Sequence, residues 1–540
     1  MSHHATGLPV LAEADIVVVG AGSAGAMLAA TLAERTDLSI LVVEAGPPAR
    51  DPLLSVPLLT GYFLRSPRYI WPFATTPQAH LDGRSLHFPR GRVVGGSGAI
   101  NGMVWARGLP SDYDHWAQRG LRDWSWQQVE PAFQSVEDLS DPRGGRALGI
   151  EMPGWWTDLY DAFLDGAAAA GLGRTDDFNG PAPEGAGRYR FTIRHGRRAP
   201  TGTLLMRAVK AGRVRLVTGA TVMRLDIADG EATGITIRRD GVEQRIFARR
   251  EVVLSAGTVG SPHILMASGV GPAAELAAAG VTPVVDAPCV GRNLHDHLLV
   301  RVEHRALQPG GLNRLLRADR AALALAEALV FGRGPAACFP LLTGGFFRSD
   351  PTLPEPDLQS HFMPALTSAT IRVNPFRAPP GVREGDGFFA NIFQMRPESR
   401  GTIRLAGPEP DTPPLIDPAY LSAEADRRVL REGVRLLRRI FAGAAFDPWR
   451  GEEMQPGAAV RSDDEIDAFI RAAADTVFHP VGTCRMGTDD AAVVDGRLKA
   501  RGVGRLRIVD ASVMPAITSS NTNAPTVMIA RRAADFIAAE

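Results

Sequence analysis

Apolar runs rich in β-branched residues alternate with a helical segment near the N-terminus. Residues 15–20 (DIVVVG) form a run that is typical of a buried parallel strand. The segment AMLAATLAER that follows has helical composition, and a second apolar run at 39–43 (SILVV) ends at Glu44. This order of strand, helix and strand predicts a Rossmann-like α/β unit.

Similar patterns recur later in the chain. The run at 252–257 (VVLSAG) predicts another buried strand that ends at a turn. The segments 356–364 (PDLQSHFMP) and 387–397 (GFFANIFQMRP) are also strand-like. These last two are expected to belong to a second, mainly antiparallel sheet.

Two helix starts are marked near the C-terminus. Ser462 and Glu465 have the spacing of a capping box before apolar residues at helical intervals, which predicts a helix from about 463 to 475. Asn523 and Pro525 precede an amphipathic run, so a last helix is expected to begin near residue 523 or 524.

A glycine-rich turn joins the first strand to its helix. It reads Gly20-Ala-Gly22-Ser-Ala-Gly25, and Glu44 lies 24 residues after Gly20. The glycines permit a tight turn, a close approach to a pyrophosphate and close helix–strand packing, while Glu44 can accept hydrogen bonds from a ribose. The motif predicts dinucleotide binding over a chance glycine-rich turn, but it leaves FAD and NAD both open.

Composition narrows the class of protein. Lys+Arg and Asp+Glu are balanced at 59 each in 540 residues, which argues against a nucleic-acid partner. The cysteines are odd in number and far apart: Cys289, Cys338 and Cys484. Neither a signal peptide nor a membrane-spanning run is evident. We therefore expect a cytoplasmic enzyme with no transmembrane segment and no disulfide framework.

Four longer motifs point to one family. They are RGRVVGGSGAINGMVWARG at 90–108, GTVGSPHILMASGVG at 257–271, FHPVGTCRMG at 478–487 and IVDASVMPAITSSNTNAPTVMIA at 508–530. Together with the first glycine motif, this order resembles the glucose-methanol-choline (GMC) oxidoreductases from end to end. The C-terminal part is most similar to the bacterial choline and alcohol dehydrogenase branch.

The resemblance implies FAD as the cofactor. It places Asn101 beside the flavin ring, and Ile100 stands where some relatives carry the histidine that tethers FAD, so a non-covalent cofactor is expected. Asp510 should face the ribityl or phosphate region, or else cap the turn that follows it. The expected cofactor-binding residues are Gly20, Gly22, Ser23, Gly25, Glu44, Ala45, Arg92, Val94, Gly95, Gly96, Asn101, Gly102, Val222, Ala256, Gly257, Asp510, Ala511, Asn523 and Thr526.

His479 and Asn523 are the expected catalytic pair. Pro480 holds His479 in an extended conformation, and an imidazole can accept the hydroxyl proton of an alcohol near neutral pH. The resemblance implies that hydride then passes to flavin N5 while Asn523 bonds the substrate oxygen. The alternatives are a structural histidine and an asparagine that only caps the helix.

The expected substrate is an uncharged primary alcohol, with oxygen or another molecule as electron acceptor. The candidate pocket residues are Trp71, His361, Met363 and Phe478. No metal site is expected, because the segment 293–297 (NLHDH) matches a family loop. The oligomeric state, the choice between oxidase and dehydrogenase, and the roles of Cys338 and His361 stay open.

The resemblance also implies the architecture. A discontinuous FAD domain is expected from 1–155, 200–303 and 464–540, and an α+β substrate domain built on an antiparallel sheet from 156–199 and 304–463. Alternative functions on this fold are choline dehydrogenase, hydroxynitrile lyase and fatty-acid photodecarboxylase. A non-enzymatic FAD-binding scaffold is a further alternative.

Overall fold

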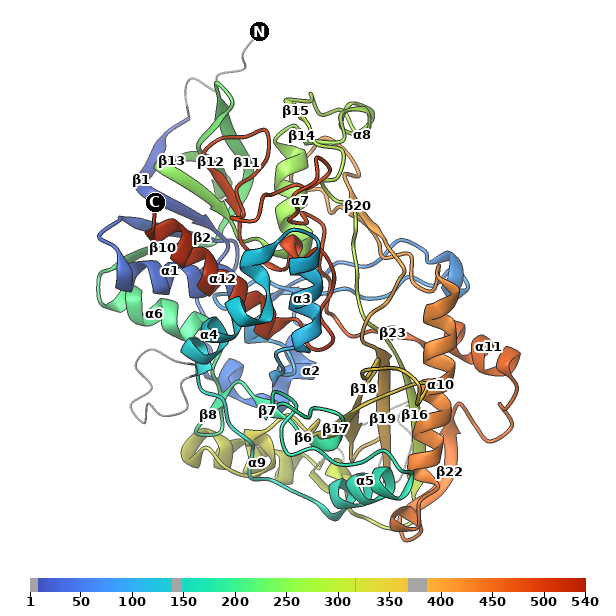
Figure 1. Cartoon of the computed structure of the whole chain (residues 1–540). Helices are drawn as coiled ribbons and strands as arrows, with labels where there is room; N and C mark the ends of the chain where they lie inside the picture. Colours follow the sequence, from blue (N-terminus) through green and yellow to red (C-terminus); the bar gives the residue numbers. More distant parts are fainter. Residues whose placement is uncertain (1–7, 138–147, 316, 368–385) are drawn as a thin grey trace.

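The computed structural model describes residues 8–137, 148–315, 317–367 and 386–540. Two seven-stranded sheets organise the molecule, one beside the chain termini and the other beneath the long helix α10 (Glu424–Phe441) (Figure 1). Each sheet has its own hydrophobic core of buried side chains.

The first sheet contains the predicted Rossmann-like unit. Its strands are β1 (Val10–Val19), β2 (Ile40–Glu44), β10 (Val214–Thr218), β11 (Ala220–Ala228), β12 (Glu231–Arg239), β13 (Val242–Leu254) and β24 (Leu506–Ile508). β10, β2, β1, β13 and β24 pair in parallel, whereas β11 and β12 form an antiparallel extension on the first half of β13. β1 begins before the predicted residue 15 because its early residues already pair with β13.

Helices enclose the first sheet. α1 (Ser23–Arg35) packs against α6 (Gly202–Lys210) and the C-terminal α12 (Asn523–Ala538), so an early helix and the last helix lie side by side (Figure 1). α7 (Gly257–Ala267) follows β13 directly. The predicted start of α12 is confirmed.

The second sheet is antiparallel throughout. Its strands are β6 (Gly185–Arg188), β16 (Leu298–Ala306), β17 (Thr343–Phe347), β18 (Leu358–Met363), β19 (Gly387–Gln394), β22 (Arg450–Gln455) and β23 (Asp475–Thr476). α10 packs on β16 and β19, and α5 (Asp158–Ala169) packs on β6 and β17. The two segments expected to supply strands of this sheet are β18 and β19, as predicted.

The two sheets exchange residues across the expected domain boundaries. β16 spans the boundary expected at 303, and all of its ladder partners lie in the second sheet. Ile403 and Ile416 come from the range expected for the substrate domain, yet both are buried in the core of the first sheet. The expected domain boundaries stay a prediction, and at these points the two sheets cross them.

Further elements join these layers. The remaining helices are α2 (Thr60–Phe63), α3 (Pro110–Gln118), α4 (Trp126–Glu137), α8 (Ala273–Ala278), α9 (Ala318–Phe331) and α11 (Asp463–Ala473). The short strand pairs are β3 (Ile70–Trp71) with β4 (Arg90–Gly91), β5 (Val104–Trp105) with β7 (Arg190–Phe191), β8 (Ile193–Arg194) with β9 (Arg197–Arg198), β14 (Val270–Gly271) with β15 (Val285–Asp286), and β20 (Thr402–Arg404) with β21 (Leu415–Asp417). The predicted capping box of α11 is present, with the Ser462 hydroxyl accepting from the Glu465 amide.

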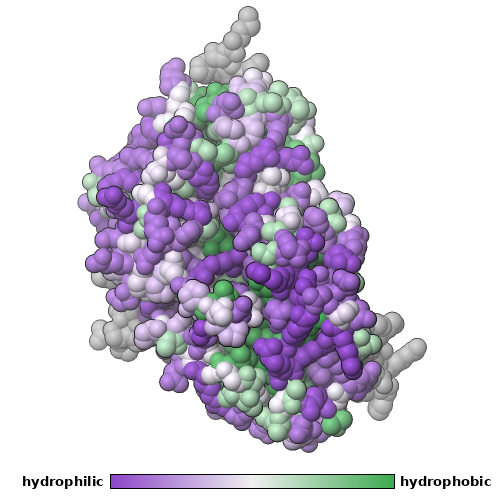
Figure 2. Space-filling view, turned by 45° about the vertical axis from the view of Figure 1, so that its right-hand side comes forward, coloured by the Kyte–Doolittle hydropathy of each residue, from purple (hydrophilic) through white to green (hydrophobic). Residues whose placement is uncertain are grey.

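The face of the molecule seen in Figure 2 is mostly polar. Hydrophilic side chains cover most of the face shown in Figure 2, with hydrophobic residues visible only in scattered places. Within the described part of the chain, no helix is both long enough and apolar enough to cross a bilayer.

Candidate active site

A cavity of about 720 Å³ is lined by residues of both sheets. It runs from the carboxyl ends of β1 and β2, past the loop after β4, to the inward face of the antiparallel sheet. This is the place where α/β folds bind dinucleotides. Most of the expected cofactor residues line it: Gly20, Gly22, Ser23, Glu44, Ala45, Arg92, Gly96, Asn101, Gly102, Val222, Ala256, Gly257, Asp510, Ala511, Asn523 and Thr526.

The glycine turn after β1 brings three backbone segments together. Gly20 has φ of +100°, and a Cβ on it would lie 2.5 Å from the Ser255 carbonyl oxygen. A Cβ on Gly96 would lie 2.6 Å from the Gly22 Cα. Because only glycine allows this packing, the two turns form one cradle of backbone at the N-terminus of α1, where a pyrophosphate can be held. Gly25, Val94 and Gly95 support the cradle without lining the cavity.

Glu44 closes the cradle at the end of β2. Its carboxylate accepts from the backbone amides of Ala21, at 2.9 Å, and Gly46, at 2.8 Å. Burial raises the pKa of Glu44 to about 7. A carboxylate has lone pairs beyond these two bonds, so it can also accept from ribose hydroxyls, as the sequence predicts.

Asp510 ties the end of β24 to the start of α7. Its carboxylate accepts from the Gly257 amide at 2.9 Å, the Ser261 hydroxyl at 2.6 Å and the Ser512 amide at 2.8 Å. It therefore caps the turn after it and also lines the cavity, while its expected place beside the ribityl or phosphate region stays a prediction.

Asn101 is held in a fixed orientation by the buried Arg198. The Arg198 guanidinium donates to the Asn101 carbonyl at 2.6 Å and to its Oδ1 at 2.9 Å. The same Oδ1 accepts from the Met103 amide at 3.0 Å. The Nδ2 group of Asn101 is thus left to donate toward the cavity.

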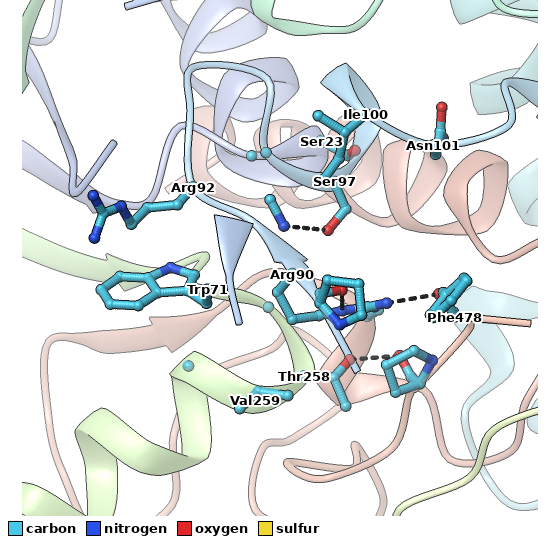
Figure 3. A pocket seen from close by; sticks show the side chains of 18 of the residues that line it. Ser23, Trp71, Arg90, Arg92, Ser97, Ile100, Asn101, Thr258, Val259 and Phe478 are labelled. Carbon is cyan, nitrogen blue, oxygen red and sulfur yellow. Dashed lines mark hydrogen bonds between the residues drawn. The ribbon is translucent and has the colours of Figure 1, made fainter. Parts of the chain in front are cut away.

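The cavity wall fits FAD. The buried Nε2 of His263 and Nε of Arg92 have no hydrogen-bond partner among the described residues, and both residues line the cavity. Buried polar atoms normally have a partner, so these two are available to a polar ligand. Ile100 also lines the wall, beside Ser97 and Asn101 (Figure 3). Together with the cradle, these groups form a dinucleotide site that continues into a less polar chamber.

His479 lies at the inner end of this chamber. Phe478 before it has φ of +64°, and its carbonyl accepts from Arg90 at 3.1 Å (Figure 3). The His479 amide donates to the buried Asp296 at 2.7 Å. Asp296 also accepts from the hydroxyls of Thr476 and Tyr420. The backbone that presents the imidazole is therefore fixed from both sides.

A chain of hydrogen bonds determines the tautomer of His479. His297 Nε2 lies 2.8 Å from the Met395 carbonyl, which can only accept, so this nitrogen carries the proton. Burial lowers the pKa of His297 to about 4, so its Nδ1 is an acceptor. His479 Nδ1, 3.0 Å away, must therefore donate. This leaves the lone pair of His479 on Nε2, which faces the Asn521 amide at 3.1 Å.

The electrostatic surroundings keep His479 neutral. Burial, and then the neighbouring His297, His361 and Arg90, lower the pKa of His479 well below its usual 6.5. A neutral imidazole whose Nε2 is unprotonated has the form that a general base needs.

The expected pairing of His479 with Asn523 is wrong. Asn521 is the neighbour of His479, whereas the Oδ1 of Asn523 accepts from the Ser23 hydroxyl at 2.7 Å. The physical reason is the docking of α12 on α1, which turns the first residue of α12 toward the cofactor cradle. Asn523 still lines the cavity, as expected for a cofactor residue, and it makes no side-chain cap.

The four expected pocket residues all line the cavity. Phe478 lies next to His479, while His361 and Met363 project from β18. Arg92 lies over the ring of Trp71, with the guanidinium carbon 5.2 Å from the ring centre (Figure 3). Cys338 is buried outside the lining residues, and burial raises the pKa of its thiol to about 12.

Sequence reasoning missed the residues that support His479. Asp296 and His297 belong to the NLHDH segment, which the sequence identifies as a family loop without a role beside His479. Asp296 accepts a hydrogen bond from the backbone amide of His479, and His297 contacts the imidazole ring of His479. The signal that could have found them is the run of polar residues in this segment. Polar side chains that become buried need hydrogen-bond partners from another part of the chain.

Comparison with protein families gives a match at both ends of the chain. A model described as GMC oxidoreductase, for the N-terminal part, matches residues 14–299. The C-terminal model of the same family matches residues 397–530.

Curated relatives match along nearly the whole length. An oxygen-dependent choline dehydrogenase of Brucella anthropi is 40% identical over 97% of this chain and 95% of its own. An oxygen-dependent choline dehydrogenase of Vibrio vulnificus is 39% identical over 97% of this chain and 94% of its own.

Solved structures of similar fold also match nearly the whole chain. Pyridoxine 4-oxidase from Mesorbium loti is 32% identical with a TM-score of 0.84, over 96% of this chain and 98% of its own. A formate oxidase variant of Aspergillus oryzae is 26% identical with a TM-score of 0.89, over 98% of both chains. With both family models matched in order and relatives that extend over nearly the full length, the chain belongs to the GMC oxidoreductase family.

Proposed function

We propose that the protein catalyses the FAD-dependent oxidation of an alcohol to the aldehyde, with His479 as the base. The observation that carries the proposal is the pair formed by His479 Nε2 and the Asn521 amide, 3.1 Å apart at the cavity wall. An alcohol oxygen placed beside this pair can donate its proton to Nε2 and accept a hydrogen bond from Asn521. FAD, when bound, supplies the hydride acceptor.

The chain's own residues supply proton transfer and orientation. His479 takes the hydroxyl proton, and the resulting imidazolium and the Asn521 amide stabilise the negative charge on oxygen. The backbone bond to Asp296 holds His479 in place, while the bond from His479 Nδ1 to His297 preserves the tautomer. Asn521 is in turn oriented by Gln359, whose Nε2 donates to the Asn521 Oδ1 at 3.1 Å.

We propose non-covalent binding of FAD. Ile100 occupies the cavity wall where a nucleophilic side chain would be needed for a tether, and an aliphatic side chain cannot form one. We also propose that the FAD domain is discontinuous, as the sequence predicts. The expected cytoplasmic location is a further proposal. The scattered cysteines support a reducing compartment.

The central test is anaerobic reduction of the bound flavin. We expect the flavin of the purified protein to leave it on denaturation, and primary alcohols to bleach the flavin absorbance in the native protein. Readmitting air then distinguishes fast reoxidation by oxygen from dependence on another acceptor. Flavin that stays attached to the denatured chain would contradict non-covalent binding. A fully loaded protein that no alcohol bleaches would contradict alcohol oxidation.

The rate of flavin reduction should not depend on pH near neutrality. Because the neutral imidazole is the active form, protonation of His479 lowers the rate as the pH drops through its pKa, which lies well below 6.5. We expect a constant rate from about pH 6.5 to about pH 9 in stopped-flow measurements. If the base had the ordinary imidazole pKa of about 6.5, the rate of flavin reduction would fall to half at that pH.

Asp296 is the second group that titrates next to His479. Burial raises the pKa of Asp296 to about 6. A fall in rate near that pH that disappears in Asp296→Asn would be assigned to this carboxyl group. A midpoint at or above 6.5 that persists in Asp296→Asn would contradict the lowered pKa of His479.

A further inference from the structure

The antiparallel sheet forms one wall of the substrate chamber. Alternate side chains of its strands point to the same face. The lining residues that it contributes on this face are Leu299 and Arg301 from β16, His361 and Met363 from β18, and Phe389 and Asn391 from β19. Two of these, Arg301 and Asn391, differ from the rest in having unused capacity to bind a polar group.

The strand register fixes their distance from His479. Leu299 pairs with Phe393, whose ring centre is 6.1 Å from that of His479. Arg301 pairs with Asn391, two residues farther along the same strands. At the usual rise of a strand this row lies about 7 Å beyond the first. Arg301 and Asn391 therefore stand one row away from the base, where the far end of a bound alcohol would lie.

Among the described residues, Arg301 forms one long ion pair with Asp475, and Asn391 has an unpaired side-chain oxygen. Asn391 is 8% exposed, and its buried Oδ1 has no hydrogen-bond partner among the described residues. The carboxylate of Asp475 is 3.7 Å from the Arg301 guanidinium, which is too long for a hydrogen bond. The unpaired Oδ1 of Asn391 can only accept a hydrogen bond, so a carboxylate cannot complete it, and Asn391 can serve a carboxylate only through its Nδ2 group. The pair thus has the features of a polar subsite.

The charge of the chamber determines which ligand suits this subsite. The acidic residues that line the cavity belong to its cofactor side: Glu44, Asp510, and Asp411, which pairs with Arg238 of β12. On the substrate side the charged residues described in the lining are Arg90, Arg301 and Arg92, which lies over Trp71. A cationic substrate would find no carboxylate among the described lining residues of this side, and the nearby Asp475 is already paired with Arg301.

An aromatic ring could in principle replace a carboxylate for a quaternary ammonium. The indole of Trp71 is already covered by the guanidinium of Arg92, 5.2 Å from the ring centre. An ammonium group beside it would be repelled by Arg92. The chamber therefore disfavours choline although choline dehydrogenases are 40% identical to this chain.

We propose that the substrate is an alcohol with a carboxylate at its far end, which Arg301 and Asn391 bind. This inference rests on the proposed function and names the substrate class of the same site. An arginine can hold a carboxylate through two parallel hydrogen bonds, with the Nδ2 group of Asn391, and not its unpaired Oδ1, as a third donor. The alcohol group then reaches His479 across a spacer such as one benzene ring.

The test compares 4-(hydroxymethyl)benzoate with benzyl alcohol, and choline with its uncharged isostere 3,3-dimethylbutan-1-ol. The kcat/KM of the FAD-loaded enzyme should be roughly 10- to 100-fold higher for the carboxylate than for benzyl alcohol, the range expected for charge-assisted hydrogen bonds. The kcat/KM for choline should be lower than the kcat/KM for 3,3-dimethylbutan-1-ol. The kcat/KM ratio of 4-(hydroxymethyl)benzoate to benzyl alcohol should fall toward one in Arg301→Met and be partly retained in Arg301→Lys. Arg305→Met, on the same strand but outside the cavity lining, should keep the wild-type ratio.

Benzoate provides a measurement without turnover. It should perturb the flavin absorbance and compete with benzyl alcohol in the wild type, and lose both effects in Arg301→Met with unchanged flavin content. If benzyl alcohol is oxidised but the carboxylate is not preferred, or the preference survives Arg301→Met, the inference is overturned while the proposed function stands. If no alcohol reduces the flavin, the proposed function itself fails.

Discussion

Replacing His479 by glutamine should slow anaerobic flavin reduction by roughly 10²- to 10⁴-fold, the usual contribution of a positioned general base. This corresponds to about 3 to 5 kcal/mol in the activation free energy. Glutamine keeps similar bulk and polarity, but it cannot take up a proton. The measurement is stopped-flow reduction at saturating alcohol, with flavin content and melting temperature as checks that the variant is folded and loaded.

The two asparagines near His479 give a matched control. Asn521→Ala should lower the reduction rate, because it removes the donor that faces His479 Nε2 at 3.1 Å. Asn523→Ala should act mainly on flavin binding, since Asn523 contacts Ser23 of the cradle at 2.7 Å. A large loss of rate in Asn523→Ala, with none in Asn521→Ala, would restore the pairing expected from sequence. A His479→Gln enzyme that reduces its flavin at the normal rate would exclude His479 as the base.

The cofactor half of the site could be predicted from sequence because its geometry is local. Gly20, Gly22 and Glu44 lie within one strand–helix–strand unit, and a parallel strand followed by a helix leaves few conformations for the turn between them. The structure places all three along the cavity. Other cofactor residues, such as Asn101 and Asp510, were found only through their resemblance to family motifs.

The catalytic half depends on contacts between distant segments. Asn521 and Asn523 are two residues apart at the start of α12, and the packing of α12 on α1 decides which of them reaches His479. His297 is 182 residues from His479 in sequence. No local pattern encodes either contact, so the sequence predicted the base but neither its hydrogen-bond partner nor the residue that sets its tautomer.

The substrate subsite shows the same limit. His361 and Met363 were expected near the cavity because they lie on a strand-like segment. Arg301 and Asn391 come from β16 and β19, and only the register of these strands places them together. The overall charge of zero therefore does not predict the local charge of Arg301 that we propose to determine specificity.

Gly20→Ala should remove most of the bound FAD and destabilise the protein. The residue has φ of +100°, which costs an L-residue about 1–3 kcal/mol. Its new Cβ would lie 2.5 Å from the Ser255 carbonyl oxygen and 3.0 Å from the carbonyl carbon, both of which are backbone atoms. Overpacking of this kind costs about 1–3 kcal/mol more. We expect a lower melting temperature and a flavin content reduced roughly tenfold, because opening the turn displaces the N-terminus of α1 from the phosphates.

Gly61→Ala is the matched control, because its Cβ would meet no atom within 4 Å and its φ is not positive. It should retain its flavin and its melting temperature. The comparison separates a general effect of an added methyl group from the specific contact between the turn after β1 and the end of β13. If Gly20→Ala kept full flavin content and stability, this backbone contact would not be required for the cradle. The phosphate site would then depend on the N-terminus of α1 and the loop around Gly96 alone.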